Sequence, residues 1–361
     1  MKQSRRIEKA FLELVKCGIW GNQPDSSLFE QCTQCDWIEI YKMAGKQTVL
    51  GICLQSILKL PETDRPQATL LLQWVGASRY IEANMLKKLA VWKELDQQWT
   101  EAGYRPVVFK GLSVAQWYAN PMSRQFSDID VYIPERFKEL IKTLKSSGIE
   151  CKHKPQHETI EYKGVSIEIH PSIINVPCKP KIKSEIIEER INDEMVIRIP
   201  DLNTYSLILL SHAGGHFLVP GIGYRFLCDW AVFLKKNHAN IDTDLVLREV
   251  KRMGMQRFAA EFTRLAEVKL GLHFDGIEKW TEGWDETYTR KLSRSLFTNG
   301  DFGAVNFKQK KKQNPIKESW DTYKNLKACK YYWPKLYWKV APGYQIKHSI
   351  LLILKYFHFR V

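Results

Sequence analysis

The spacing of apolar residues divides the chain into helical and strand-forming regions. Residues 1 to about 100 carry apolar side chains at the spacing of amphipathic helices. The clearest stretches are IEKAFLELVKCGIW at 7–20 and a long run at 68–103 that ends at Gly103. The repeating side chains are Leu, Trp, Ala and Ile, so we predict packed helices without chemistry of their own.

The pattern changes after Arg105-Pro106, where short β-prone runs alternate with helical ones. Helices are predicted at 112–120 and 134–148, a loop at 120–127, and strands at 106–111, 128–133, 158–164, 165–173 and 195–200. The runs that meet at Gly164 are typical of a hairpin. This alternation predicts a small unit with a mixed sheet.

Helical spacing returns after Pro200. Asp201 is suited to cap the first helix, and further helical patterns cover 223–237 and 242–271. We therefore predict an α+β fold with an α/β-like core between N- and C-terminal helical regions. The predicted domains are a helical region at 1–104, the core at 105–200, a helical domain at 201–300 and a basic, aromatic-rich tail at 301–361.

The net charge of +14 is concentrated at the C-terminal end. Residues 305–361 contain thirteen Lys and Arg against two acidic residues, with Trp and Tyr among them. Such a tail favours an anionic partner, which could be RNA, an anionic membrane surface or a phosphorylated substrate. The simpler alternatives are a solvated charge run at 308–312 and a C-terminal helix docked on the core.

We expect neither a signal peptide nor a transmembrane segment. Glu8, Glu13 and Lys16 interrupt the apolar character of the N-terminus, and no run of about 18 apolar residues occurs. Cys32 and Cys35 form a lone CxxC, so free thiols in a reducing compartment are expected. We predict a cytoplasmic protein, with attachment to the inner membrane face through the tail as the alternative.

The stretch SRQFSDIDVYI at 123–133 places Asp128 and Asp130 on either side of Ile129. Residues i and i+2 of a strand share a face, so the two carboxylates would stand side by side. Like charges at that spacing raise each other's pKa unless a cation lies between them. The stretch alone leaves two interpretations open, a divalent-cation site or a strand end that faces solvent.

A third acid favours the cation site. Glu168 alternates with isoleucines in a predicted strand. Beside the strand of Asp128 it would complete a three-carboxylate cluster suited to Mg²⁺. Two ions held in this way stabilise the attacking and leaving oxygens of an in-line displacement at phosphorus.

Residues upstream of the aspartates offer donors to phosphates. Lys110 and Gly111 end a predicted strand where a helix begins, and the first amides of a helix favour an anion. Ser113 could add a contact, and Arg124 could reach a triphosphate from its loop. Together with the aspartate pair and Glu168, these donors predict a nucleotide site.

These motifs resemble the polymerase β-like nucleotidyltransferase superfamily, in which a glycine turn and a helix precede a DxD strand. Within it, VVFKGLSVAQWY, SRQFSDIDVYI and IEIHPSI are similar to a bacterial family of uncharacterised nucleotidyltransferases. The resemblance covers residues 105–235, and the matching positions are Lys110, Gly111, Arg124, Asp128, Asp130, Glu168, His170, Arg225 and Asp229. The chain departs from the superfamily pattern at Ser113, one place later than the usual Gly-Ser turn, and at the third acid, which is Glu.

The resemblance implies roles for the acids. Asp128 and Asp130 would hold the metals that carry a nucleoside triphosphate such as ATP, and Glu168 would bind the second metal and help deprotonate an acceptor hydroxyl. The hydroxyl would attack the α-phosphorus, and pyrophosphate would leave. The implied cofactor is a pair of Mg²⁺ ions, with Mn²⁺ as the alternative.

Further polar residues have both a structural and a substrate-side interpretation: His170, His212, His216, Arg225 and Asp229. The histidines of SHAGGHF have the i, i+4 spacing of metal sites, but Ala213 stands where a zinc protease needs Glu. The Arg and Asp four residues apart could equally be a helix ion pair. His170 would orient Glu168 or the strand end.

Three functions stay open at this stage. The leading one is Mg²⁺-dependent transfer of a nucleoside monophosphate to a hydroxyl of a small molecule, glycan or protein. The basic tail suggests RNA or tRNA 3′-end transfer as the second. The third is a non-catalytic accessory protein at a membrane surface. Neither the acceptor nor the preferred base is indicated by the residues.

Overall fold

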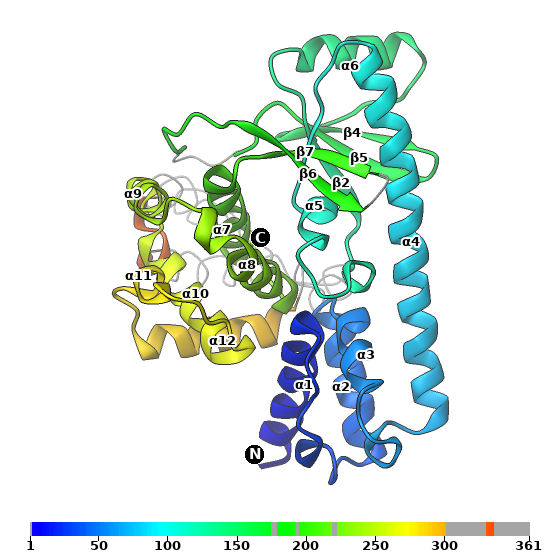
Figure 1. Ribbon diagram of the computed structural model, residues 1–361, viewed down its shortest axis with the longest axis vertical. Helices are drawn as coiled ribbons and strands as arrows, with labels where there is room; N and C mark the ends of the chain where they lie inside the picture. Colours follow the sequence, from blue (N-terminus) through cyan, green and yellow to red (C-terminus); the bar gives the residue numbers. More distant parts are fainter. Residues whose placement is uncertain (1, 175–178, 193–194, 219–221, 301–329, 336–361) are drawn as a thin grey trace, which may run out of the picture.

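The computed structural model describes residues 2–174, 179–192, 195–218, 222–300 and 330–335. It has the predicted α+β fold, in which helices precede and follow a mixed five-stranded sheet (Figure 1). Most of the basic tail lies outside the described residues. Its RNA, membrane and docked-helix interpretations therefore stay predictions, as does the division into four domains.

The N-terminal region consists of helices, as predicted: α1 (Lys2–Trp20), α2 (Gln34–Lys46), α3 (Leu50–Ile57) and α4 (Ala68–Glu101). Thr33 and Asp36 form a capping box at the start of α2. The long helix α4 runs alongside the sheet (Figure 1). It is joined to the sheet by the Tyr162 hydroxyl, which donates to Glu94 Oε1 at 2.7 Å.

The sheet has the order β1-β2-β5-β4-β3. Its strands are β1 (Val107–Phe109), β2 (Asp128–Tyr132), β3 (Lys152–Lys154), β4 (His157–Tyr162) and β5 (Val165–His170). β2 and β5 are parallel, and the other neighbours are antiparallel. The predicted hairpin is confirmed: β4 and β5 are joined by Lys163 and Gly164, whose φ angles of 49° and 69° suit a two-residue turn.

The helices expected at 112–120 and 134–148 are shorter in the structure, and two strands, β3 and β6, were not predicted. The helix expected at 112–120 is the shorter α5 (Gly111–Ala115), because Tyr118 turns into the core and donates to Asp229 at 2.6 Å. The helix expected from Pro134 is α6 (Phe137–Ser146). Residues 195–200 form β7 (Met195–Pro200), which pairs with the unpredicted β6 (Ile186–Asn192).

Helices resume after β7. Asp201 caps the first of them as predicted, because Oδ1 accepts the backbone N–H of Asn203 and Thr204 at 3.1 and 3.0 Å. The pattern at 242–271 is divided into two helices at Gly254, which has a φ of 78°. The C-terminal helices are α7 (Leu202–Leu218), α8 (Tyr224–Asn237), α9 (Thr243–Met253), α10 (Gln256–Leu270), α11 (Ile277–Thr281) and α12 (Glu286–Asn299).

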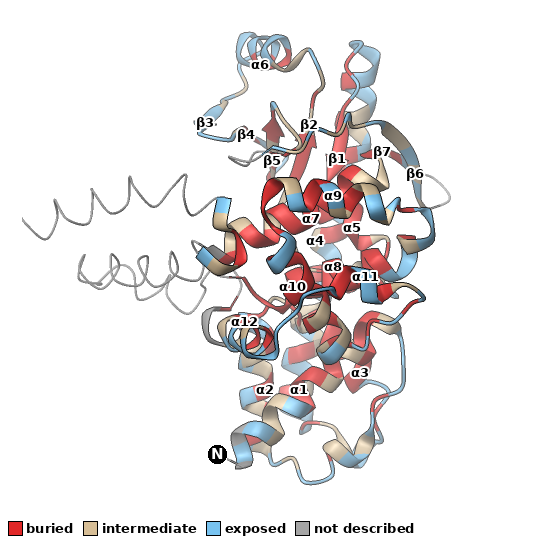
Figure 2. Ribbon diagram, turned by 90° about the vertical axis from the view of Figure 1, so that its left-hand side faces the viewer, coloured by how far each residue is buried: buried red, intermediate tan, exposed pale blue. Residues whose placement is uncertain are grey.

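The buried residues run through the strands and the inner helices (Figure 2). Alternate residues of β2 and β5 belong to this core and are fully buried: Ile129, Val131, Ile167 and Ile169. Their neighbours in sequence therefore face the other side of the sheet. Among the helices in the described ranges, none combines the length and apolar character needed to cross a bilayer.

Candidate functional site

The parallel pairing of β2 and β5 places acidic side chains next to one another. In this register Asp130 is the direct partner of Glu168, and Asp128 is two residues earlier on the same strand. Because side chains alternate along a strand, Asp128 and Asp130 share the face opposite to the buried isoleucines. The structure thus brings Glu168 next to Asp128 and Asp130, although Glu168 lies 40 residues after Asp128 in the sequence.

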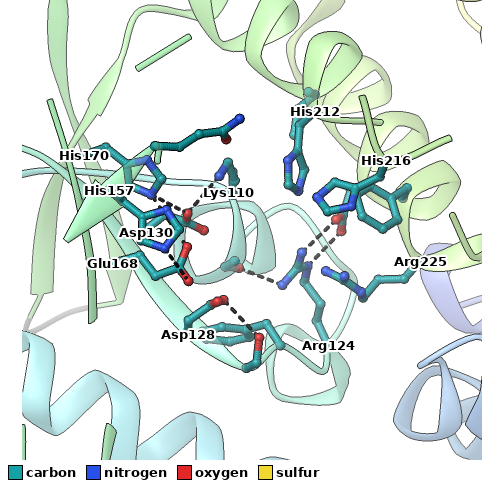
Figure 3. Close-up of a pocket in the computed structure, with 17 residues that line it drawn as sticks. Lys110, Arg124, Asp128, Asp130, His157, Glu168, His170, His212, His216 and Arg225 are labelled. Carbon is teal, nitrogen blue, oxygen red and sulfur yellow. Dashed lines mark hydrogen bonds and ion pairs between the residues drawn. The ribbon is translucent and has the colours of Figure 1, made fainter. Parts of the chain in front are cut away.

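This polar face forms one wall of a pocket of about 280 Å³ (Figure 3). The opposite wall comes from α7 and α8, and the loop before β2 closes one side. Among the residues that line it are Lys110, Gly111, Arg124, Asp128, Asp130, His157, Glu168, His170, His212, His216, Arg225 and Asp229. All the predicted site residues except Ser113 therefore meet at one cavity.

The turn after β1 places the positively charged side chain of Lys110 next to the acidic residues. Lys110 Nζ lies 2.8 Å from Asp130 Oδ1. The backbone of Lys110 has a φ of 61°, a costly conformation for a residue with a side chain. The phenol oxygen of Tyr205 accepts its N–H at 2.9 Å and helps hold this conformation. Strained backbone of this kind is found most often at functional sites.

Gly111 allows the turn to approach β2 closely. A Cβ at this position would lie 2.8 Å from the ring of Phe126 and 3.2 Å from the carbonyl oxygen of Asp128. Both contacts are shorter than a side chain accepts without displacing its neighbours. The glycine therefore determines how near Lys110 stands to the aspartates.

The three carboxylates are not equivalent electrostatically. Burial, with the charges of Asp130 and Glu168 next to it, raises the pKa of Asp128 to about 6. Burial also acts to raise the pKa of Asp130, but Lys110 and His170 outweigh it and hold that pKa well below its usual range. For Glu168, burial is outweighed by the nearby His157 and Lys154, so its pKa is lowered.

Two histidines contact these acids. His170 Nε2 lies 3.0 Å from Asp130 Oδ1 and 3.8 Å from Glu168 Oε2. Burial lowers the pKa of His170, which favours its neutral form. His157 Nε2 lies 3.0 Å from Glu168 Oε1. His157 was not among the predicted residues, although counting back from a two-residue turn at Lys163-Gly164 would have placed it opposite His170.

The role expected for Arg124 does not agree with its contacts. The side chain is 1% exposed, and its Nε and Nη2 each donate to a carboxylate oxygen of Asp229 at 2.7 Å. Its Nη1 donates to the carbonyl oxygen of Gly111 at 2.9 Å. The guanidinium faces the pocket, but these bonds hold it between α8 and the glycine turn, so reaching for a triphosphate would require breaking a buried bidentate pair.

Ser113 does not face the pocket. It is fully buried, its hydroxyl lies 2.5 Å from the hydroxyl of Tyr205, and it donates to the carbonyl oxygen of Lys110 at 3.2 Å. The expected phosphate contact is therefore replaced by a structural one. The one-residue offset from a Gly-Ser turn is the reason, because it moves the hydroxyl into the helix interior.

The helical wall presents His212, His216 and Arg225 toward the acids (Figure 3). The two imidazole rings stack edge to face with centroids 4.5 Å apart. Burial lowers the pKa of His212 well below its ordinary value, so this imidazole is neutral. Arg225 Nε donates to the hydroxyl of Thr48 at 3.1 Å, while Asp229 accepts from Arg124 and Tyr118.

The donor set suits a divalent cation. Three carboxylates face one pocket, and oxygen ligands of this kind are those that Mg²⁺ prefers. Asp130 and Glu168 both act to raise the pKa of Asp128, which means that Lys110 compensates the negative charge of the cluster only in part. A bound cation would remove this remaining repulsion. Among the described residues, the group whose ligand atoms already lie within 4.8 Å of one another is His157, Glu168 and His170, and neither the two aspartates nor Cys32 and Cys35 belong to it.

The sequence model of a protein family described as uncharacterised nucleotidyltransferase matches residues 33–271. That span contains every residue that lines the pocket and all five strands of the sheet. Neither the curated proteins nor the solved structures contain a match to this chain.

Proposed function

The chain belongs to this family of uncharacterised nucleotidyltransferases, and from that membership we propose that it is a Mg²⁺-dependent enzyme of the polymerase β-like type. It transfers a nucleoside monophosphate from a nucleoside triphosphate to a hydroxyl group, and pyrophosphate leaves. The observation that carries the proposal is the register of β2 and β5, which sets Asp130 beside Glu168 with Asp128 on the same face.

In this proposal each acid has a role. Asp128 and Asp130 would hold the cations, which when bound would neutralise the triphosphate and stabilise the oxygens at the reacting phosphorus. Glu168 accepts the proton of the acceptor hydroxyl. The hydroxyl oxygen forms a bond to the α-phosphorus as the bond to the pyrophosphate oxygen breaks.

The turn after β1 binds phosphate. Lys110 is 17% exposed and has three N–H donors, of which one reaches Asp130. The other two are available to an anion that enters the pocket. Gly111 lets the phosphates approach the backbone closely, since no side chain stands in the way.

The helical wall binds the acceptor. His212, His216 and Arg225 face the acids across the cavity, so an acceptor between the two walls would have its hydroxyl close to Glu168. A neutral imidazole has one N–H donor and one acceptor nitrogen, so His212 can form a hydrogen bond with a hydroxyl group of the acceptor. The chemical class of the acceptor stays open.

Nucleotide-dependent stabilisation tests the site without knowledge of the acceptor. The purified chain is heated with Mg²⁺ and each nucleoside triphosphate, as wild type and as Asp128→Asn and Asp130→Asn. Loss of an outer-shell partner of a metal already weakens binding about 10–100-fold, so loss of a direct ligand should weaken it at least about 100-fold. At a ligand concentration of 100 Kd, wild type gains about 2.7 kcal/mol and such a variant about 0.4 kcal/mol.

Asp244→Asn provides the matched control, because this side chain on α9 is 78% exposed and its ion pair within the described residues is with Lys279 at 3.3 Å. It should gain as much from the nucleotide as wild type. If Asp128→Asn and Asp130→Asn fold normally and also gain as much, the assignment of the site is wrong. Transfer itself is followed as pyrophosphate release when fractions that contain candidate acceptors are added.

A further inference from the structure

Two imidazoles and a carboxylate form a cluster at the edge of the acidic wall. It consists of His157 on β4 and of Glu168 and His170 on β5. One ligand atom from each residue lies within 4.8 Å of the other two. The closest approaches are 3.0 Å from His157 Nε2 to Glu168 Oε1 and 3.8 Å from His170 Nε2 to Glu168 Oε2.

The β4–β5 hairpin explains why the three side chains converge. Thr159 is the partner of Glu168 across the two strands, so the position of His157 falls opposite His170. Their rings lie 5.0 Å apart between centroids. The turn at Lys163-Gly164 sets this register, and a shift by one residue would send His157 to the other face.

The spacing is compatible with ligands around one ion. Zn²⁺ binds imidazole nitrogen and carboxylate oxygen at about 2.0–2.2 Å, so two ligand atoms of the same ion lie at most about 4.3 Å apart. The three atoms need to move by only a few tenths of an ångström to meet this limit. They approach from two adjacent strands, and the fourth side of the cluster opens into the pocket.

Neither ring nitrogen of His157 has a hydrogen-bond partner within the described part of the chain, although Nε2 pairs with Glu168 Oε1 as an ion pair at 3.0 Å. A buried polar group without a partner costs about 1–3 kcal/mol. A metal ion bound to the ring would satisfy one of these nitrogens.

We propose that His157, Glu168 and His170 bind a transition-metal ion of the Zn²⁺ or Mn²⁺ class, while Asp128 and Asp130 keep an all-oxygen site for Mg²⁺. This inference rests on the proposed function for the role of the neighbouring acids. Imidazole suits Zn²⁺ and other transition metals, whereas Mg²⁺ takes oxygen ligands. The two metal positions of this chain would then differ in the ion that they select.

The competing interpretation is that the histidines only orient the acids. His170 is hydrogen-bonded to Asp130 at 3.0 Å, and outer-shell imidazoles of this kind hold carboxylates in place. In that case His157 would not bind the metal, and replacing it would leave the absorption spectrum of the bound ion unchanged.

Cobalt(II) is the probe that separates these interpretations, because its visible absorption reports the number and type of its ligands. The metal-free full chain is titrated with Co²⁺, as wild type, His157→Gln and His153→Gln. His153 lies on the adjacent strand β3 with 79% of its side chain exposed and contacts Glu158, so it is the matched control. Far-UV circular dichroism confirms that each variant folds.

We expect wild type and His153→Gln to give the same spectrum and the same affinity, with a roughly hundredfold excess of Mg²⁺ unable to displace Co²⁺. His157→Gln should change the spectrum and weaken binding at least about tenfold. An unchanged spectrum and affinity in folded His157→Gln would overturn the inference. So would a wild-type chain that binds no Co²⁺.

The outcome is separable from that of the proposed function. Asp128→Asn leaves the histidine cluster intact, so it should keep Co²⁺ binding and lose stabilisation by Mg²⁺ and nucleotide. Co²⁺ binding without any nucleotide binding in wild type would contradict the proposed function alone. Nucleotide binding that depends on Asp128, with no effect of His157→Gln on Co²⁺, would contradict this inference alone.

Discussion

Each wall of the pocket contains an aspartate that forms an ion pair with a basic side chain. On the sheet side, Lys110 Nζ reaches Asp130 with a single contact of 2.8 Å, and the lysine side chain is 17% exposed. On the helix side, Arg124 binds both oxygens of Asp229 at 2.7 Å and is 1% exposed. Tyr118 adds a further hydrogen bond to Asp229 at 2.6 Å.

The difference shows which charges are available to a ligand. The pair on the helix side satisfies its own charges and joins α8 to the glycine turn through the bond from Arg124 to Gly111. The pair on the sheet side leaves donors of Lys110 free to bind, and Lys110 compensates the charge of Asp128 only in part, since burial, Asp130 and Glu168 still raise the pKa of Asp128. We therefore regard the first pair as structural and the second as the one that exchanges with metal and phosphate.

The largest expected effect is on stability, from breaking the structural pair. Arg124→Met leaves Asp229 charged and buried, which should lower the free energy of unfolding by about 3–5 kcal/mol. Lys110→Met leaves Asp130, whose side chain is 7% exposed, with the hydrogen bond to His170, so it should cost less, about 1–3 kcal/mol. Urea unfolding of both variants measures the two losses. Equal losses would remove the distinction between the pairs.

A double variant checks the cause of that loss. Arg124→Met combined with Asp229→Leu removes both charges, and replacement of a buried pair by apolar residues is often close to neutral. The double variant should therefore be more stable than Arg124→Met alone. If it is as unstable as the single variant, packing rather than the unpaired charge explains the effect.

The alternation of residues within a strand was enough to predict much of this site. Asp128 and Asp130 with Ile129 between them, and Glu168 between two isoleucines, indicated a polar face that the structure confirms. The hairpin at Gly164 was predicted in the same way. Strand periodicity and turn residues are local properties, and they can be recognised without knowledge of the tertiary contacts.

The roles of Arg124 and Ser113 were not predictable from local sequence. Their partners are Asp229 and Tyr205, which lie 105 and 92 residues further along the chain. A side chain that could reach a ligand from its own loop is instead bound by a helix from the C-terminal region. His157 is the opposite case, because the predicted hairpin already contained the register that places it beside His170.

The next effect is an expected gain in stability at the exchangeable site. Burial, together with Asp130 and Glu168, raises the pKa of Asp128 from its usual value of 3.8 to about 6. A raised carboxyl pKa means that ionisation of this group destabilises the folded chain. The loss of stability is complete above pH 6 and absent below about pH 4. Asp128→Asn removes this penalty and should stabilise the metal-free chain by about 1–3 kcal/mol at pH 8.

Unfolding at pH 8 and pH 4 measures this gain. The difference between Asp128→Asn and wild type should shrink as the pH falls through 6, because wild type then becomes protonated. Asp229→Asn is the comparison on the helix side and should be less stable than wild type at pH 8, since it weakens the bond to Arg124. A destabilised Asp128→Asn at pH 8 would contradict the electrostatic argument.

Gly111 connects the two walls and should be sensitive to a single added methyl group. Gly111→Ala places a Cβ 2.8 Å from Phe126 and 3.2 Å from the carbonyl oxygen of Asp128, which should cost about 1–3 kcal/mol through overpacking. The control is Gly76→Ala on α4, where a Cβ meets nothing within 4 Å. That variant should gain up to about 1 kcal/mol. Chemical unfolding measures the stability of both variants. If Gly111→Ala is as stable as wild type, the turn can shift to accommodate the added methyl group.

The smallest effect is the dependence of Mg²⁺ affinity on pH. A cation binds the ionised carboxylate of Asp128, whose pKa lies at about 6 because of burial and of the two neighbouring acids. Below that pH the affinity should fall about tenfold for each unit, which corresponds to about 1.4 kcal/mol. Asp130 and Glu168 have lowered pKa values and stay ionised between pH 5 and 7, so neither produces a fall in this window.

Isothermal titration of Mg²⁺ into the metal-free chain between pH 5 and 8 measures this dependence. The charged groups that act on Asp128 include Lys110 and Lys88, and the neighbouring Asp130 contacts His170, whose pKa is lowered by burial. Asp128→Asn should bind weakly and lose the fall below pH 6. A similar fall in that variant would assign the titration to His170 instead, and Asp128 would then be as fully compensated as Asp229 on the opposite wall.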